Sequence, residues 1–152
     1  MATDMKQFII AYLDKDQYGI DINYIDNIIV MQSITRIPKA QSWFQGVINL
    51  RGEIVPVMSL CKRLGKEETP CTSSSRIIIV RPDSQAAPVG IIVDSVKEVI
   101  TLEPGAIEKI NYEEQDEKAN YSIGIGKYGA ELVNLLNIPN IVIEKDGNAR
   151  KE

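Results

Sequence analysis

A twelve-residue pattern occurs twice in this chain, and it constrains the fold more than any other feature. Residues 18–29, YGIDINYIDNII, align without gaps with residues 89–100, VGIIVDSVKEVI. Soon after each copy comes a Thr-x-x-Pro sequence, at 35–38 and at 101–104. The repeat predicts two similar β units that pack on each other. The alternative is that a β-rich chain repeats Gly-Ile patterns by chance.

Short strands account for most of the remaining sequence. Runs rich in Ile and Val are bounded by Gly, Pro, Asn, Asp or Ser, which is typical of strands in all-β barrels and sandwiches. These runs are 6–13, 17–22, 46–50, 53–60, 75–80, 89–94, 121–126 and 130–136. Each half also has a hairpin with a glycine turn, at Arg51-Gly52 and at Tyr128-Gly129. We expect only short helical turns besides, near 42–45, 59–65 and Pro139, and surface loops at 65–75 and 111–120.

The composition argues against several classes of function. The chain has no histidine, which is the usual general base near neutral pH and the commonest zinc ligand. We therefore expect no catalytic residues, no metal and no cofactor. The net charge of −4 argues against nucleic-acid binding, where lysine and arginine must neutralise phosphates. The two cysteines, Cys61 and Cys71, are interpreted as incidental thiols, although one disulfide between them is geometrically possible.

The sequence also indicates where the protein acts. No apolar run approaches the ~18 residues of a membrane span, and the N-terminus lacks the pattern of a signal peptide. We expect a cytoplasmic protein with no direct membrane insertion.

Residues 46–60, GVINLRGEIVPVMSL, place a charged turn and a proline in an apolar hairpin. Pro56 cannot donate a hydrogen bond to a neighbouring strand, so we expect its strand to be an edge or to be bulged. An edge beside aliphatic surface can receive a partner. Arg51 at the tip could bind a carboxylate or backbone carbonyls, although a solvated arginine without function fits the hairpin as well.

The longer segment FQGVINLRGEIVPVMSL closely resembles the signature hairpin of the bacterial chemotaxis coupling protein family, CheW. The two repeat copies, ITRIP and the LEP turn support the resemblance, which extends from about residue 7 to about residue 140. The NLRG hairpin is shared with the regulatory domain of the chemotaxis histidine kinase CheA. This chain is too short for the kinase's dimerisation, ATP-binding and phosphotransfer domains.

The resemblance implies an all-β fold of two packed five-stranded SH3-like β-barrel subdomains with short helical turns. We expect a single CheW-like domain over 1–152, made of two intertwined subdomains at roughly 14–80 and 81–140, with terminal segments able to cross over. The implied function is a non-enzymatic adaptor. It would couple the cytoplasmic tip of chemoreceptors (methyl-accepting chemotaxis proteins) to the regulatory domain of CheA, in membrane-associated receptor arrays. The alternatives are an adaptor of a pilus-motility or other chemosensory array, and a small β-barrel nucleic-acid binder.

In the family, the receptor-binding groove lies between the two barrels. Ile25, Gly46 and Arg51 match family positions in that groove. Asn27 stands where the family often carries a glutamate that pairs with the arginine, and we expect it to accept a hydrogen bond from Arg51. The resemblance therefore predicts an aliphatic crevice beside the Arg51 turn. We expect Gly46→Asp to weaken receptor binding while leaving the fold largely intact.

Two further groove residues follow from the repeat. Ile28 and Val99 occupy equivalent places in the two halves, although either fits a plain core position equally well. The implied partner is a helical hairpin, whose apolar face would lie in the groove. Kinase binding should use other surface, so that both partners bind at once.

Overall fold

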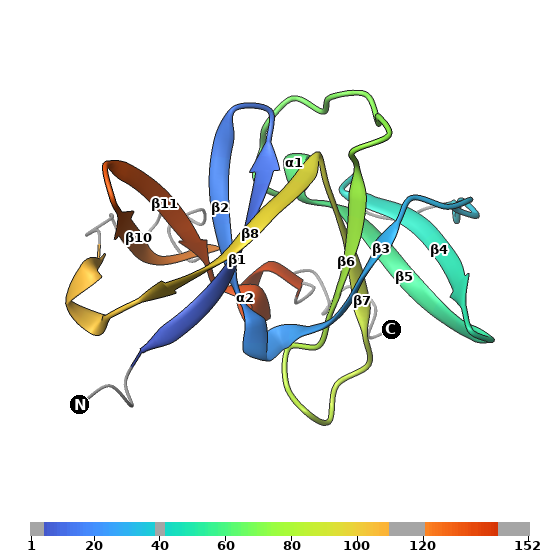
Figure 1. Cartoon of the computed structure of the whole chain (residues 1–152). Coiled ribbons are helices and arrows are strands. Elements are labelled where there is room, and N and C mark those ends of the chain that lie inside the picture. Colours follow the sequence, from blue (N-terminus) through green and yellow to red (C-terminus); the bar gives the residue numbers. More distant parts are fainter. Residues whose placement is uncertain (1–4, 39–41, 110–120, 143–152) are drawn as a thin grey trace.

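Two β-sheets, each curled on itself, lie side by side in the computed structural model (Figure 1), which describes residues 5–38, 42–109 and 121–142. The five-stranded sheet has the order β3 (Ile25–Val30), β6 (Arg76–Val80), β7 (Val89–Val93), β5 (Glu53–Ser59), β4 (Phe44–Leu50). The six-stranded sheet has the order β8 (Ser95–Leu102), β1 (Lys6–Leu13), β2 (Asp16–Asp21), β11 (Glu131–Leu136), β10 (Ser122–Tyr128), β9 (Ile107–Glu108). Short helices follow β5 and β11, namely α1 (Leu60–Arg63) and α2 (Ile138–Val142).

The all-β class is confirmed, with one more strand among the described residues than the ten of two five-stranded barrels. The edge strands β3 and β8 were not among the strand runs expected from composition. The sixth strand, β9, has two residues and pairs with β10. The sheets divide the chain differently from the expected subdomains at 14–80 and 81–140. The five-stranded sheet takes 25–93 without interruption, whereas the six-stranded sheet joins 6–21 to the segment after 94. The expected loop at 111–120 lies outside the described residues.

The sequence repeat has a structural counterpart in two strands that are each followed by a crossing between the sheets. β2 pairs in parallel with β11, Gly19 opposite Leu135, before the chain passes to β3. β7 pairs in parallel with β5, Gly90 opposite Val57, before the chain passes to β8. A Cβ on Gly19 would lie 2.7 Å from Leu135 Cδ2, and one on Gly90 would lie 2.8 Å from Ile77 Cγ2. Leu135 and Ile77 belong to the clusters inside the six-stranded and the five-stranded barrel, so each glycine makes room for a side chain of its own barrel interior.

The hydrophobic core has three parts. One cluster fills the six-stranded barrel: Phe8, Ile10, Ile100, Leu102, Val133 and Leu135. A second fills the five-stranded barrel: Ile48, Val55, Val57, Ile77 and Ile79. The third and largest, here called the central cluster, joins buried residues from both sheets, such as Ala11, Leu13, Ile78 and Val93, with Leu60, Cys61, Ile138 and Ile141 from the helices. The two barrels therefore share a packed interface.

A buried arginine ties the two helices to this interface. Arg63, at the end of α1, is 8% exposed, and its Nε donates a hydrogen bond to the Ile141 carbonyl at 2.8 Å. Its guanidinium carbon lies 4.5 Å from the centre of the Trp43 ring and 5.2 Å from that of Tyr121. A desolvated cation over an aromatic ring contributes about 2 kcal/mol. Arg63 follows the β4–β5 hairpin, and it contacts Trp43 before that hairpin and Tyr121 and Ile141 on either side of the β10–β11 hairpin.

Pro56 does not lie on an edge strand, because β5 runs between β7 and β4. Its partner Val47 exchanges both backbone hydrogen bonds with Thr35, at 2.8 and 2.9 Å, so the Val47–Pro56 pair is not hydrogen-bonded. Pairing with β7 begins only at Val57. The missing donor of Pro56 therefore costs no ladder hydrogen bond, although β5 is central in the sheet.

Two smaller findings concern the hairpin turn and the thiols. In the second hairpin Tyr128 pairs with Glu131, so the turn is Gly129-Ala130 rather than Tyr128-Gly129. Cys61 is buried and Cys71 exposed, and both are free.

Among the described residues, no helix has the length and apolar character that crossing a membrane requires.

Candidate functional site

The edge strand β3 presents aliphatic side chains to the space between the barrels. Ile25 lies opposite Val80, and Ile28 lies opposite Ile78, in the β3–β6 ladder. Directly opposite residues share a face of the sheet, and Val80 and Ile78 belong to the central cluster. Ile25 and Ile28 therefore face that cluster, and both are half-buried against it.

The edge strand β8 of the other sheet also carries aliphatic side chains on the face that is directed toward the central cluster. Val96 lies opposite Ala11, and Val99 lies opposite Ile9, in the β1–β8 ladder. Ile9 and Ala11 are two residues apart and share a face, so Val96 and Val99 share it too. Val96 packs on the central cluster, whereas Val99 is 49% exposed. Aliphatic surface thus extends along β8 from the core into solvent.

We call Ile25, Ile28, Val96 and Val99 the seam. β3 and β8 are each an edge strand of their sheet. The seam contains three of the six residues predicted for the groove, namely Ile25, Ile28 and Val99. Val96 was not among them, although the sequence repeat aligns it with Ile25.

The other side of β3 faces the mouth of the five-stranded barrel. Asn27 lies opposite Ile79, whose side chain belongs to the barrel interior, so Asn27 points away from the seam. A β-bulge between Ile25 and Asn27 produces this change of face. Asn27 and Arg51 line one hollow of about 350 Å³, together with Asp26, Leu50, Glu53, Ile79, Arg81 and Pro88. Because five of these eight residues are polar or charged, the expected aliphatic crevice beside the Arg51 turn is wrong.

The expected hydrogen bond between Asn27 and Arg51 is wrong as well. Asn27 Oδ1 accepts from the backbone N–H of Ile28 at 2.9 Å. The ion pair at this mouth joins Arg81 Nε to Asp26 Oδ2 at 2.8 Å. Within the described part of the chain, Arg51 has no hydrogen bond or ion pair. It adopts φ +53 at the hairpin tip, where its side chain is exposed.

Gly46 is a structural glycine. It is buried in β4 with φ +143, a conformation that essentially only glycine adopts. A Cβ there would overlap the carbonyl oxygen of Thr35. That oxygen accepts from Val47 N–H in the bridge that joins the segment after β3 to β4. The expectation that Gly46→Asp leaves the fold intact is therefore wrong, because any side chain at this position must displace the bridge.

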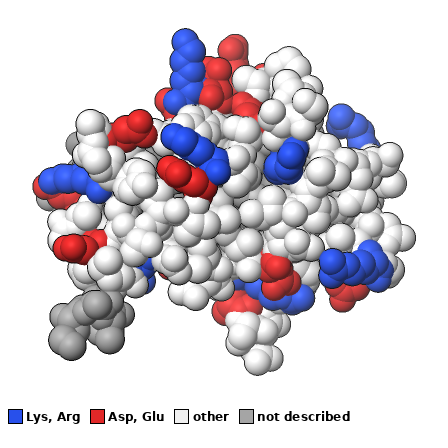
Figure 2. Space-filling model, viewed as in Figure 1, with Lys and Arg blue, Asp and Glu red and all other residues white. Residues whose placement is uncertain are grey.

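Charge is dispersed on the face shown in Figure 2. Lysine and arginine side chains there alternate with aspartate and glutamate, and no continuous basic patch is visible among the described residues. This face therefore does not favour the nucleic-acid alternative. The described residues also include no group of three His, Cys, Asp or Glu side chains that could hold a metal ion.

Edge strands beside aliphatic side chains can receive a partner protein. The family model of the CheW-like domain matches residues 7–145, so the chain belongs to that family. Its members are non-enzymatic scaffold or adaptor proteins of chemotaxis.

Individual relatives agree with this assignment. The chemotaxis protein CheW of Bacillus subtilis is 32% identical over 143 residues, which cover 94% of this chain and 90% of that protein. The crystal structure of the scaffolding protein TtCheW from Thermoanaerobacter tengcongensis matches with a TM-score of 0.80 and 30% identity, over 92% of this chain and 94% of that one. The protein PilI of Pseudomonas aeruginosa is 39% identical over 62 residues, or 41% of this chain and 34% of that protein.

Proposed function

We propose that this protein couples the cytoplasmic tips of transmembrane chemoreceptors to the regulatory domain of the histidine kinase CheA. It acts in the cytoplasm and is recruited to membrane-associated receptor arrays. Membership of the CheW-like family supports this role, and the seam is the single structural observation that carries it.

The seam suits an amphipathic helix of the receptor tip. Such a helix buries its apolar face in a groove, while polar groups at the rim fix its register. Ile25, Ile28 and Val96 are already half-buried, so they are held in place before a partner arrives. Val99 is half exposed, and burying the rest of its side chain contributes about 1 kcal/mol. The seam therefore supplies a preorganised apolar strip whose most accessible member is Val99.

Arg51 provides the polar end of this surface. Since β3 is an edge strand, a partner lying along it contacts the seam on one face and reaches the barrel mouth on the other. Arg51 there is exposed, and its guanidinium can bind a carboxylate or main-chain carbonyls of the partner. Asn27 lines the same mouth and offers its side-chain amide N–H groups.

The proposal is tested by co-purification with a receptor tip fragment and the CheA regulatory domain, read together with kinase activation. Val99→Glu should weaken receptor capture at least about tenfold, which corresponds to about 1.4 kcal/mol. It should leave capture of the CheA domain unchanged. Leu132→Glu is the matched control, because Leu132 is an aliphatic residue of the same sheet that is 65% exposed and lies outside the seam. Equal receptor capture by both variants would refute the seam as the receptor site.

A related pilus-motility or other chemosensory array is the second candidate. The match to PilI favours it, because the identity over those 62 residues is 39%. Co-purification from the native host with the receptors and kinases of each array distinguishes the two. Recovery of pilus-system partners alone would select this second candidate.

A further inference from the structure

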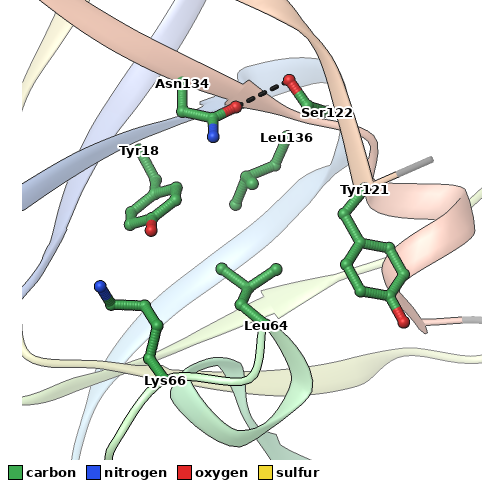
Figure 3. Close-up of a pocket in the computed structure, with 7 residues that line it drawn as sticks. All are labelled: Tyr18, Leu64, Lys66, Tyr121, Ser122, Asn134 and Leu136. Carbon is green, nitrogen blue, oxygen red and sulfur yellow. Dashed lines mark hydrogen bonds between the residues drawn. The ribbon is translucent and has the colours of Figure 1, made fainter. Parts of the chain in front are cut away.

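A small hollow lies where the segment after α1 meets the six-stranded sheet (Figure 3). Its volume is about 200 Å³. Its lining comes from β2, from the segment after α1, from the β10–β11 hairpin and from the residue before β10: Tyr18, Leu64, Lys66, Tyr121, Ser122, Asn134 and Leu136. None of these residues belongs to the seam or to the barrel mouth. The hollow is therefore separate from the surface assigned to the receptor.

The orientation of the Asn134 amide is fixed by its neighbour. Ser122 Oγ lies 2.7 Å from Asn134 Oδ1 and 3.3 Å from the Gly124 carbonyl oxygen, so its single proton is donated over the shorter contact to Asn134. Ser122 Oγ in turn accepts a hydrogen bond from Gly124 N–H at 3.1 Å. With its oxygen occupied, the side chain has two N–H donors left on Nδ2. Figure 3 shows Nδ2 directed away from Ser122, toward the hollow beside Tyr18 and Leu136.

Lys66 and Tyr18 add further donors to the same hollow. Lys66 Nζ donates to Asp16 Oδ2 at 2.6 Å and also interacts with the Tyr18 hydroxyl group, which leaves one further N–H donor on the ammonium group. That hydrogen bond also raises the pKa of Lys66, which keeps the side chain cationic. Burial raises the pKa of Tyr18, so its hydroxyl keeps its proton at neutral pH. Three donor side chains thus line one wall, whereas Leu64 and Leu136 present carbon atoms.

The lining defines the chemistry of a ligand. Hydrogen bonds from a cation to a carboxylate are about twice as strong as neutral ones, and an acceptor with two oxygens matches a set of donors. A hollow of about 200 Å³ lies below the roughly 300–1,000 Å³ of sites for drug-sized ligands. It has room for a short acid only. We propose that this hollow binds a carboxylate on a short aliphatic stem, with its oxygens between Lys66 and Asn134 and its stem against Leu64 and Leu136.

The carboxylate has two possible sources, a free short-chain acid and the glutamate side chain of a docked protein. Either one contacts both the segment after α1 and the six-stranded sheet, and so links two parts of the chain that pack in the central cluster. The proposal stands apart from the receptor-coupling function, since no seam residue takes part.

The first test is an NMR titration of the full chain with butyrate, observed at the side-chain amide signals of Asn134. Butyramide is the matched ligand, because it has a similar shape without the charge. We expect butyrate to shift these signals with an affinity at least about fivefold higher than that of butyramide. Equal affinities, or no shift at Asn134, would overturn the proposal.

Two variants of the same site should change the affinity for butyrate in opposite directions, and a third variant serves as the control. Lys66→Gln should weaken butyrate binding about tenfold, because it removes the cation. Asp16→Asn should strengthen binding about threefold, because it removes a carboxylate that competes for Lys66. Lys62→Gln is the control, since Lys62 is an exposed lysine of α1 that pairs with Glu68 at 3.5 Å and does not line the hollow. The proposal fails if Lys62→Gln weakens binding as much as Lys66→Gln, or if Asp16→Asn weakens it.

A final arm separates the two sources. N-acetylglutamate N-methylamide carries the acid as it occurs in a protein chain. Binding at least as tight as that of butyrate identifies a partner's glutamate. Weaker binding, with butyrate still shifting Asn134, identifies a free acid.

Discussion

Replacing Gly46 with alanine should destabilise the protein severely. The strained backbone at φ +143 costs a non-glycine residue about 1–3 kcal/mol. The added Cβ also displaces the Thr35 carbonyl and with it the two hydrogen bonds of the Thr35–Val47 bridge, each worth about 1 kcal/mol. The total is about 3–5 kcal/mol, which is a large part of the 5–15 kcal/mol that stabilises a typical domain. At about 2–4 °C per kcal/mol for a chain of this size, Tm should fall by about 6–20 °C.

Two other glycines serve as matched controls in the same thermal assay. Gly52 has φ +87 with open space around it, so Gly52→Ala should cost only the left-handed strain of about 1–2 kcal/mol. Gly105 has open space and no positive φ, so Gly105→Ala should leave Tm within about 2 °C of the parent. Parent-like melting of Gly46→Ala, or a loss at Gly105→Ala equal to that at Gly46→Ala, would refute this reasoning.

Two further outcomes are expected. Arg63→Met should lower the free energy of unfolding by about 2–4 kcal/mol, because the Ile141 carbonyl loses its donor and the Trp43 ring loses its cation. Urea unfolding monitored by the fluorescence of Trp43 measures this change. A loss of less than about 0.5 kcal/mol would contradict the reasoning. Stability should also fall as pH rises above about 9, because burial raises the pKa of Cys61 and of Tyr18, so that the unfolded chain releases these protons first. Urea unfolding from pH 7 to 10 measures this decline in stability, which should be shallower in Cys61→Ala. The same decline in both proteins would count against the role of Cys61.

The repeat was the most informative part of the sequence because it reflects a packing constraint. Gly19 and Gly90 occur at the same place in the two copies since each leaves room for side chains inside its own barrel. The same logic places Ile25 and Val96 on corresponding edges of the central cluster. The fold class and three of the four seam residues could therefore be predicted from the repeat and the family resemblance.

The expected aliphatic crevice beside Arg51 was wrong because the single strand β3 contributes to two surfaces. Ile25 and Asn27 are two residues apart and would share a face in a regular strand, but a β-bulge between them turns them to opposite faces. Nothing in the local sequence indicates that bulge. The role of Gly46 depends on the carbonyl of Thr35, which lies eleven residues earlier in the chain, so it too could not be inferred from the hairpin alone.

The seam can be examined most directly by methyl NMR of the labelled full chain as a receptor tip fragment is added. Signals from Ile28 and Val99 should shift or broaden, since both lie on the surface that the helix covers. The signal from Leu132, which is 65% exposed and lies outside the seam, should stay unchanged. Perturbation of Leu132, with Ile28 and Val99 unaffected, would contradict the account.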